Sequence, residues 1–161
     1  MVAVVLCGEE MLICGQVNPA PIQDKEYHGV YFSAKDDLDT KARRLSGTPL
    51  CIEHNGTVSV GRVLQGWMDK ATGSAWALAE IDVSQMPGAI AAAAVSQGNF
   101  KEFSLGYSSK IQRNPVTGKL EAFDKQIKEL SIVKVGARPN CTIAAHGGVR
   151  PATRSLIHKN E

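Results

Sequence analysis

The stretch FKEFSLGYSSKIQRNPVTGKLEAFDKQIKELSIVKVG, residues 100–136, decides the fold that the sequence predicts. Two long segments that mix apolar and polar residues, 100–112 and 119–136, flank the sequence RNPVTG at 113–118. Strand-like segments joined by a short loop that contains Pro and Gly are typical of paired antiparallel strands. The stretch therefore predicts a long β-hairpin.

Shorter β-like segments precede this hairpin along the chain. The sequence predicts strands at residues 2–7, 11–17, 30–32, 50–55, 58–68 and 74–82. The turn DKATG at 69–73 joins the last two as a second hairpin. Because strands outnumber helices and lie in antiparallel-looking pairs, we expect a mainly β fold with peripheral helices (α+β), built as an antiparallel β-barrel.

Two peripheral helices are predicted. In residues 33–47, apolar side chains recur at helical spacing and Ser33 can cap the first turn. In residues 84–99, Ser84 is the expected N-cap and Pro87 falls in the tolerant first turn. Gly98 is expected to end this second helix. Residues 137–161 show no clear period, so we expect an irregular C-terminal tail.

Composition limits the classes of protein to consider. The 161 residues suit one domain, 1–161, and the net charge of +2 does not favour nucleic acid or an anionic membrane as a partner. No apolar run approaches the length of a membrane span, and the N-terminus lacks the charged start of a signal peptide. The four cysteines are scattered, which indicates reduced thiols in an intracellular protein: Cys7, Cys14, Cys51 and Cys141.

The segment CIEHNGTVSVGRV, residues 51–63, contains a histidine within a strand-like run. A turn follows His54, which places the imidazole at a strand end, where functional sites are often built. A lone histidine in this position is nevertheless more often structural than catalytic. Its role therefore depends on which other side chains lie near it.

Two further side chains are candidates for chemistry. Ser104 lies between two apolar residues of a predicted strand, so it points to the opposite face of the sheet. Glu129 shares one face with apolar neighbours by period two, namely Ile127, Val133 and Val135, together with Ser131. A carboxylate there either lies at the rim of the sheet facing water or holds the second ring nitrogen of His54.

A metal site is the main alternative for these residues. Two pairs, Cys51 with His54 and Cys141 with His146, would supply two thiolates and two imidazoles. However, neither pair shows the knuckle turn with Cys-x-x-Cys spacing of a structural zinc site. The glycines near 106, 136 and 147 do not form a phosphate loop, because no lysine and helix start follow them. We therefore expect no metal and no cofactor.

Three segments together resemble the herpesvirus capsid-maturation proteases (assemblins) and the related prohead proteases of tailed phages. LCIEHNGTVSVGRVLQ, residues 50–65, resembles the histidine segment of that family, and GNFKEFSLGYSSK, residues 98–110, resembles its nucleophile strand. ELSIVKVGARPN, residues 129–140, is similar to the segment that carries the third member of the triad and the oxyanion hole. The three segments follow the order of the family.

The resemblance implies a role for each residue. His54 would be the general base, Ser104 the nucleophile and Glu129 the third member, where mammalian herpesvirus enzymes have a second histidine and phage relatives an acidic residue. Backbone N–H groups of Ala137 and Arg138 would form the oxyanion hole. Arg138 matches the second of two family arginines, which helps to hold a water there.

The resemblance also implies a function. We expect a viral capsid (prohead) maturation serine endopeptidase with a Ser-His-Glu triad, which cleaves scaffold or capsid precursor protein and releases itself from a precursor. It would act inside the assembling procapsid, in the bacterial cytoplasm for a phage or the host nucleus for a herpesvirus. A homodimer is among the partners that the resemblance allows. However, the long helical tail of the assemblins has no counterpart after Cys141, which favours a phage-like or minimal version.

Two alternatives remain open. The chain could be a non-catalytic β-barrel of the same fold that takes part in capsid assembly or binds scaffold protein. Within the enzyme class, Ser131 could be the nucleophile in place of Ser104. Ser131 lies two residues from Glu129 on the same predicted strand, which is an awkward position from which to share His54.

Overall fold

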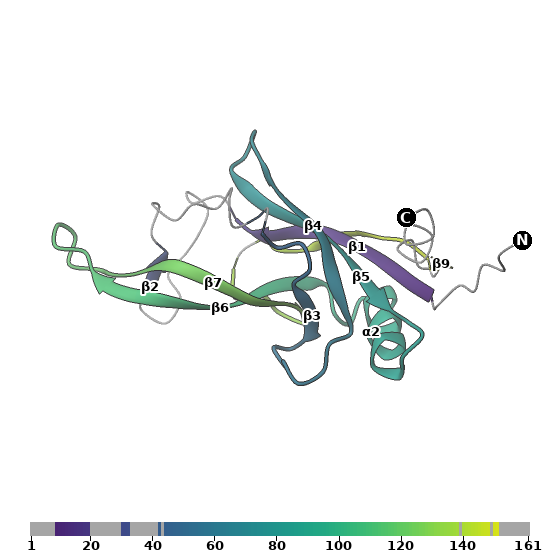
Figure 1. Cartoon of the computed structure of the whole chain (residues 1–161). Helices are drawn as coiled ribbons and strands as arrows, with labels where there is room; N and C mark the ends of the chain where they lie inside the picture. The colour runs from purple at the N-terminus through teal and green to yellow at the C-terminus, as the bar shows by residue number, and fades with distance from the viewer. Residues whose placement is uncertain are drawn as a thin grey trace, which may run out of the picture.

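The structure, a computed structural model, describes residues 9–19, 30–32, 42, 44–138, 140–148 and 150–151. These residues are mostly β, as predicted, and nine strands join one sheet (Figure 1). The elements are β1 (Glu9–Asn18), β2 (Val30–Phe32), β3 (Pro49–Ile52), β4 (Gly61–Asp69), β5 (Ser74–Asp82), α2 (Met86–Ser96), β6 (Glu102–Arg113), β7 (Leu120–Val133), β8 (Ile143–His146) and β9 (Arg150–Pro151).

The predicted long hairpin is confirmed as β6 and β7, which pair antiparallel from Glu102 opposite Val133 to Arg113 opposite Leu120. In Figure 1 this hairpin extends well beyond the other strands. At its tip the Asn114 side-chain oxygen accepts hydrogen bonds from the N–H groups of Val116 and Thr117. The short polar turn thus forms locally, as the sequence predicts.

The sheet is mixed, whereas the sequence indicated only antiparallel pairs. β7 pairs with β6 along one edge, and its other edge pairs in parallel with β2 at its start and β3 at its end. From β3 the sheet continues through β4, β5 and β1 to β8, all antiparallel. Parallel neighbours are joined by long connections, so no local turn signal reveals them.

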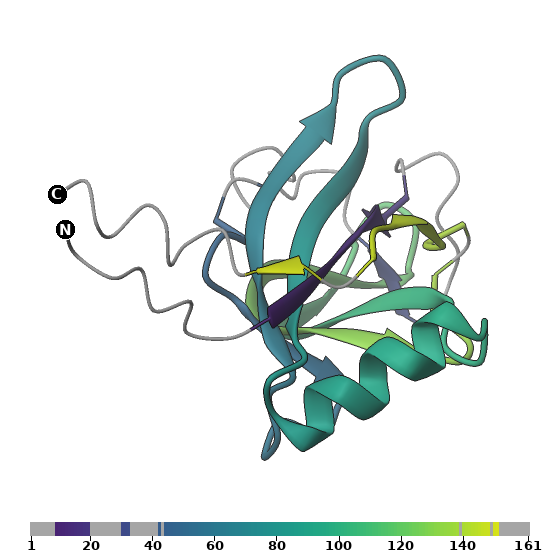
Figure 2. The ribbon, with the colours of Figure 1, turned by 90° about the vertical axis from the view of Figure 1, so that its right-hand side faces the viewer.

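The sheet curls until its two ends approach each other (Figures 1 and 2). The start of β6 meets the segment before β8: the N–H of Phe103 donates to the carbonyl of Cys141 at 2.7 Å, and the N–H of Ile143 donates to the carbonyl of Lys101 at 2.9 Å. The core fills the inside of the curl. Its fully buried large side chains include Met11, Ile13, Leu45, Leu50, Ile81, Phe103, Leu130 and Ile132.

The predicted helix at 84–99 is confirmed as α2, which packs against β5 (Figure 2). Its start differs from the prediction, because Gln85 and not Ser84 is the N-cap, without a capping side chain. The Ser84 hydroxyl instead donates to Asp82 Oδ1 at 2.5 Å, in a turn that ends β5. The last helical residue is Ser96, and Gly98 follows the C-cap Gln97 with a φ of 76°, which ends the helix as expected.

The C-terminal segment corrects another expectation. Residues 143–146 and 150–151 form β8 and β9, which pair with β1, whereas an irregular tail was predicted after residue 137. These strands are too short to show a period, and the edge of β1 supplies their hydrogen bonds.

The predicted strand 2–7 and most of the predicted helix 33–47 lie outside the described residues. Within the described part of the chain, no helix is long and apolar enough to cross a membrane.

Candidate active site

The β6–β7 hairpin places two of the expected side chains on one face. Ser104 lies opposite Ser131 and Gly106 lies opposite Glu129 in the register of the two strands. Residues opposite each other, and residues two apart on a strand, point to the same face of a sheet. Ser104 and Glu129 therefore lie diagonally opposite each other on one face of the hairpin. Leu105 and Leu130 point to the other face, toward the core.

His54 reaches this face of the hairpin from the end of β3. β3 lies beside β7 with Cys51 opposite Ser131, and the N–H of Glu53 donates to the carbonyl of Ile132 at 3.1 Å. Glu53 and His54 then adopt positive φ values of 48° and 60°. Two consecutive non-glycine residues in this region cost about 1 kcal/mol or more each, so surrounding contacts must hold them.

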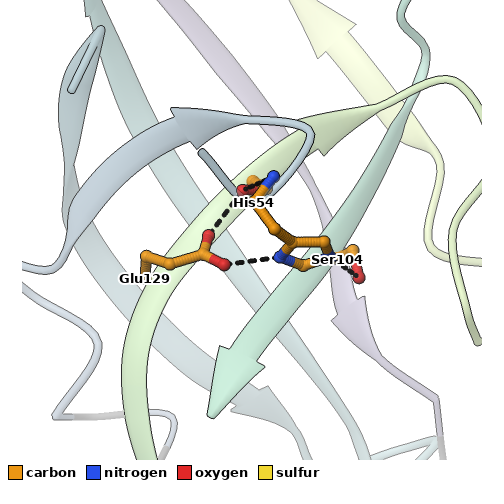
Figure 3. A network of polar contacts seen from close by, with 4 residues as sticks. His54, Ser104 and Glu129 are labelled. Atoms are coloured by element: carbon orange, nitrogen blue, oxygen red, sulfur yellow. Dashed lines mark hydrogen bonds and ion pairs between the residues drawn. The ribbon is translucent and has the colours of Figure 1, made fainter. Parts of the chain in front are cut away.

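The three expected side chains form a continuous chain of hydrogen bonds (Figure 3). His54 Nδ1 lies 2.5 Å from Glu129 Oε1, and His54 Nε2 lies 3.0 Å from Ser104 Oγ. The side chains of Glu129 and Ser104 thus lie on opposite sides of the imidazole, as the figure shows. The structure brings together all three residues that the sequence singled out.

These contacts favour one tautomer of the neutral imidazole. An ionised carboxylate only accepts hydrogen bonds, so Nδ1 carries the ring proton and donates a hydrogen bond to Glu129. Nε2 is then the basic nitrogen, and it accepts from the Ser104 hydroxyl. This is the arrangement in which a histidine can remove the proton of a serine while a carboxylate stabilises the resulting imidazolium.

Burial differs along the chain of contacts. The side chain of His54 is 44% exposed, whereas that of Glu129 is 12% exposed and therefore does not lie at a rim facing water. Ser104 is 8% exposed. The base is thus accessible from solvent, while the carboxylate is shielded and interacts with its protein partners.

The predicted face of Glu129 is wrong at two positions. Val135 lies beyond the end of β7 and is exposed. Ile127 packs against the core instead of sharing the face of Glu129. The register shows why: Gly106 lies opposite Glu129 but Tyr107 lies opposite Ile127, so β7 contains one extra residue. Such a bulge shifts the alternation by one residue and aims the side chains beyond it to the other face.

The roles of two residues near the carboxylate were not recognised from the sequence. Gly106 leaves the space for it, because a Cβ at this position would overlap with Glu129 Oε1. Ser131 donates from its hydroxyl to Glu129 Oε2 at 2.5 Å and accepts from the N–H of His54 at 3.0 Å. The Glu-x-Ser spacing on a strand placed both side chains on one face, and this is the signal that could have indicated the contact of Ser131 with Glu129.

The interpretation of Ser131 as nucleophile does not fit these contacts. Its hydroxyl donates its hydrogen bond to Glu129 Oε2, and its contact with His54 is made by the backbone N–H of the histidine and not by the ring. Ser131 is also completely buried. Ser104 is the serine whose hydroxyl meets the basic nitrogen.

A pocket of about 340 Å³ opens beside Ser104 and His54. Ala137 and Arg138, the expected oxyanion-hole residues, line the same pocket. The N–H of Gly136 is taken, because it donates to Glu102 Oε2 at 2.7 Å. The Arg138 guanidinium donates to the Tyr107 hydroxyl at 3.1 Å and lies 5.6 Å from the centre of that ring.

The alternative of a metal site finds no support among the described residues. They contain no group of three or more His, Cys, Asp or Glu side chains arranged to hold an ion. Both ring nitrogens of His54 are engaged with Ser104 and Glu129. Cys14 and Cys51 are free thiols. Burial, and then the negative charge of Glu129, raise the pKa of the Cys51 thiol.

Comparison with known proteins identifies solved structures that have a similar fold. No protein-family model matches the sequence, and no curated protein is similar to it. Among solved structures, the chain matches the protease of Kaposi's sarcoma-associated herpesvirus (KSHV) in complex with a hexapeptide phosphonate inhibitor, with a TM-score of 0.57 and 15% identity. The match covers 86% of this chain and 65% of that one, so this chain spans less than two thirds of the length of that protease.

Two other structures of KSHV protease match to a similar degree. The complex with an allosteric inhibitor has a TM-score of 0.53, and the complex with a dimer disruptor has a TM-score of 0.54. Each is 15% identical over 92% of this chain and 80% of that one. At this identity the likeness concerns the path of the backbone. The curled, mainly β sheet of this chain is therefore the herpesvirus protease fold.

Proposed function

We propose that this protein is a serine endopeptidase that uses Ser104 as nucleophile, His54 as general base and Glu129 as the acid that orients and stabilises the base. The observation that carries the proposal is the unbroken chain of hydrogen bonds from Ser104 Oγ through the imidazole to Glu129. Its place on a protease fold supports the same conclusion.

The first half of the reaction follows from these atoms. Ser104 Oγ attacks the carbonyl carbon of the scissile peptide bond while its proton passes to His54 Nε2. The imidazolium keeps its Nδ1 proton directed at Glu129 Oε1. When the tetrahedral intermediate breaks down, the Nε2 proton passes to the leaving amine and an ester remains on Ser104.

The second half repeats the same proton transfers with water. A water molecule gives its proton to His54 Nε2 and attacks the ester carbon. The proton then returns to Ser104 Oγ as the acid product leaves. In both halves, backbone N–H groups at Ala137 and Arg138 would stabilise the oxyanion, each worth about 3 kcal/mol. Their position on the wall of the pocket beside Ser104 supports this role.

The substrate of the proposed enzyme is viral scaffold or capsid precursor protein, cleaved during maturation of the procapsid, and the enzyme would also free itself from a precursor. The resemblance of three sequence segments to assemblins and phage prohead proteases supports this part of the proposal, together with the fold of KSHV protease. The proposed place of action is the interior of the assembling procapsid, with a homodimer as a further state.

Covalent labelling tests the chemistry directly. We expect a peptidyl phosphonate to add once to the protein, with the adduct mapped to Ser104 by mass spectrometry. KSHV protease has been crystallised with a phosphonate inhibitor, which makes this class of probe suitable. Ser104→Ala should take no adduct. Ser108→Ala is the matched control, since Ser108 is an exposed serine of the same strand, and it should react like the wild type.

The same experiment separates the proposal from its rival. A folded wild-type protein that takes no adduct would be a non-catalytic barrel that binds scaffold or capsid protein. Capsid maturation is tested by mass spectrometry of a longer precursor incubated alone. We expect release of the protease by the wild type and an intact precursor when Ser104 is alanine.

A further inference from the structure

Ser131 lies at the centre of the candidate site without being part of the proposed triad. On β7 it is opposite Ser104 of β6 and opposite Cys51 of β3. Its exposed fraction is 0%. A hydroxyl that is removed from water in this way needs hydrogen-bond partners within the protein. The identity of those partners indicates what the residue does.

The hydroxyl joins the acid to the base by a second route. It donates to Glu129 Oε2 at 2.5 Å and accepts from the backbone N–H of His54 at 3.0 Å. Both directions are determined, because the carboxylate can only accept and the main-chain N–H can only donate. One buried hydroxyl therefore contacts the side chain of the acid and the main chain of the base.

The first contact fixes the carboxylate. The terminal torsion of a glutamate side chain has a broad energy minimum, so a single hydrogen bond leaves the carboxylate free to rotate. Here Oε1 faces His54 Nδ1 and Oε2 faces Ser131, so both oxygens are held. Because Gly106 has no side chain, the carboxylate can occupy the space next to this residue in this orientation.

The second contact fixes the base. His54 and Glu53 both have positive φ values, a conformation that non-glycine residues adopt only when their surroundings hold them. From this backbone position the imidazole meets Ser104 and Glu129 together. The hydrogen bond from the His54 N–H to Ser131 holds the residue where its conformation is strained.

On the basis of the proposed function, we infer that Ser131 is a positioning residue of the reaction. Its hydroxyl locks the Glu129 carboxylate and the His54 backbone into one arrangement, so that the base is aligned before substrate binds. Ser131 does not line the pocket beside Ser104. It therefore affects the rate of the chemical step and not the binding of the substrate.

The test measures phosphonate labelling of Ser104 as a function of probe concentration, for the wild type and for Ser131→Ala. We expect the limiting rate of adduct formation to fall by about 10- to 100-fold, because small misplacements of reacting groups lower reaction rates by such factors. The probe concentration at half of the limiting rate should stay unchanged. The final amount of adduct should also match that of the wild type, because the protein remains folded.

Two further variants separate positioning from simple loss of stability. Ser74→Ala removes another buried, hydrogen-bonded hydroxyl, which lies on β5 and accepts from Trp76 Nε1 at 3.0 Å. It should label at the wild-type rate. Ser131→Thr keeps a hydroxyl at position 131 and should recover most of the rate. If Ser131→Ala does not fold, Ser131→Cys replaces it, since a thiol of similar shape is only a weak donor.

The outcomes distinguish this inference from the proposed function. If wild-type protein takes no adduct on Ser104, both are wrong. If wild-type protein is labelled and folded Ser131→Ala, or its cysteine substitute, reacts at the same limiting rate, only the role of Ser131 is wrong. A rate that falls as much in Ser74→Ala would also overturn it, because the effect would then follow from stability alone.

Discussion

Residue 106 must be glycine for Glu129 to reach His54 in the observed way. The two residues lie opposite each other on β6 and β7, and their side chains would share one face. An added Cβ would overlap with the Oε1 atom that contacts the imidazole. The absence of a side chain at position 106 therefore leaves the space that the Glu129 carboxylate occupies.

We expect Gly106→Ala to lower both activity and stability. The methyl group must displace the Glu129 carboxylate, so the rate of phosphonate labelling should fall by about tenfold or more. Overpacking should cost about 1–3 kcal/mol in the free energy of unfolding, measured with urea. Gly56→Ala is the control, since nothing lies within 4 Å of a Cβ at this position. Equal labelling rates for the two variants would contradict the interpretation.

The Cys51 thiol should make stability depend on pH in the alkaline range. Burial and the charge of Glu129 raise its pKa from the ordinary value of 9.0. As the pH rises past that value, an unfolded thiol loses its proton while the folded one keeps it. The folded protein then binds more protons than the unfolded one, so its stability decreases with pH from about 9 up to the folded pKa.

Urea unfolding at pH 7 and pH 10 tests this expectation. The loss in free energy of unfolding between the two pH values should be smaller for Cys51→Ala than for wild type. Cys14→Ala should act in the same direction, because burial also raises the pKa of the Cys14 thiol. The same loss in the wild type and in Cys51→Ala would show that the thiol makes no such contribution.

At the scale of elements, the segment after β7 is held by two carboxylates. Glu53 Oε1 accepts from the N–H of Lys134 at 2.9 Å, and Glu102 Oε2 accepts from the N–H of Gly136 at 2.7 Å. Glu53 directly precedes His54, and Glu102 starts the strand of Ser104. The expected oxyanion-hole segment is thus tied to the two segments that carry the base and the nucleophile.

We expect Glu102→Ala to loosen this segment. Loss of a charge-assisted hydrogen bond should cost about 1–2 kcal/mol of stability. The limiting rate of labelling should fall several-fold, because the backbone at Ala137 and Arg138 is no longer fixed relative to Ser104. Glu102→Gln, which keeps an acceptor oxygen, should be closer to the wild type.

Glu121→Ala is the matched control for Glu102. Glu121 Oε1 accepts from the Asn114 side chain at 2.5 Å, near the distant tip of the same hairpin. Its removal should leave the labelling rate unchanged. If Glu102→Ala also labels at the wild-type rate, the hydrogen bond between Glu102 and the N–H of Gly136 does not matter for the reaction.

The elements that the sequence revealed are those that form from local signals. The β6–β7 and β4–β5 hairpins were predictable because their turns lie between their strands. The parallel pairing of β3 with β7 was not, since about 80 residues separate Cys51 from Ser131. The bulge in β7 was also hidden, because only the register with β6 shows the extra residue before Glu129.

The site divides in the same way. His54, Ser104 and Glu129 could be predicted because each lies in a segment that resembles a known family, and the structure brings the three together. The roles of Gly106 and Ser131 were missed because they depend on which residues lie opposite each other across strands. A single sequence gives the alternation along each strand but not the register between strands.

At the scale of the whole molecule, the two faces of β7 serve different purposes. Leu130 and Ile132 point inward and are completely buried in the core. Glu129 and Ser131, between and beside them, point to the site. Because side chains alternate along a strand, neighbouring residues serve the fold and the proposed chemistry separately.

Substitutions at the adjacent residues 129 and 130 should therefore affect different properties of the protein. Leu130→Ala leaves a cavity beneath the site and should cost about 2–5 kcal/mol in the free energy of unfolding, with little change in the limiting labelling rate of the folded protein. Glu129→Gln keeps the shape of the side chain and should change stability little. Its limiting rate should fall by about 10³- to 10⁴-fold, because the charge that orients and stabilises the imidazolium is lost.

Urea unfolding and phosphonate labelling of both variants, at a temperature where each is folded, measure the two effects independently. The final amount of adduct reports the folded fraction, so a low rate with full final labelling indicates a defect in chemistry. A large loss of stability in Glu129→Gln with an unchanged rate would mean that the carboxylate supports the fold and not the base. In that case the buried Glu129 would be a structural partner of His54, and the triad would lack its third member.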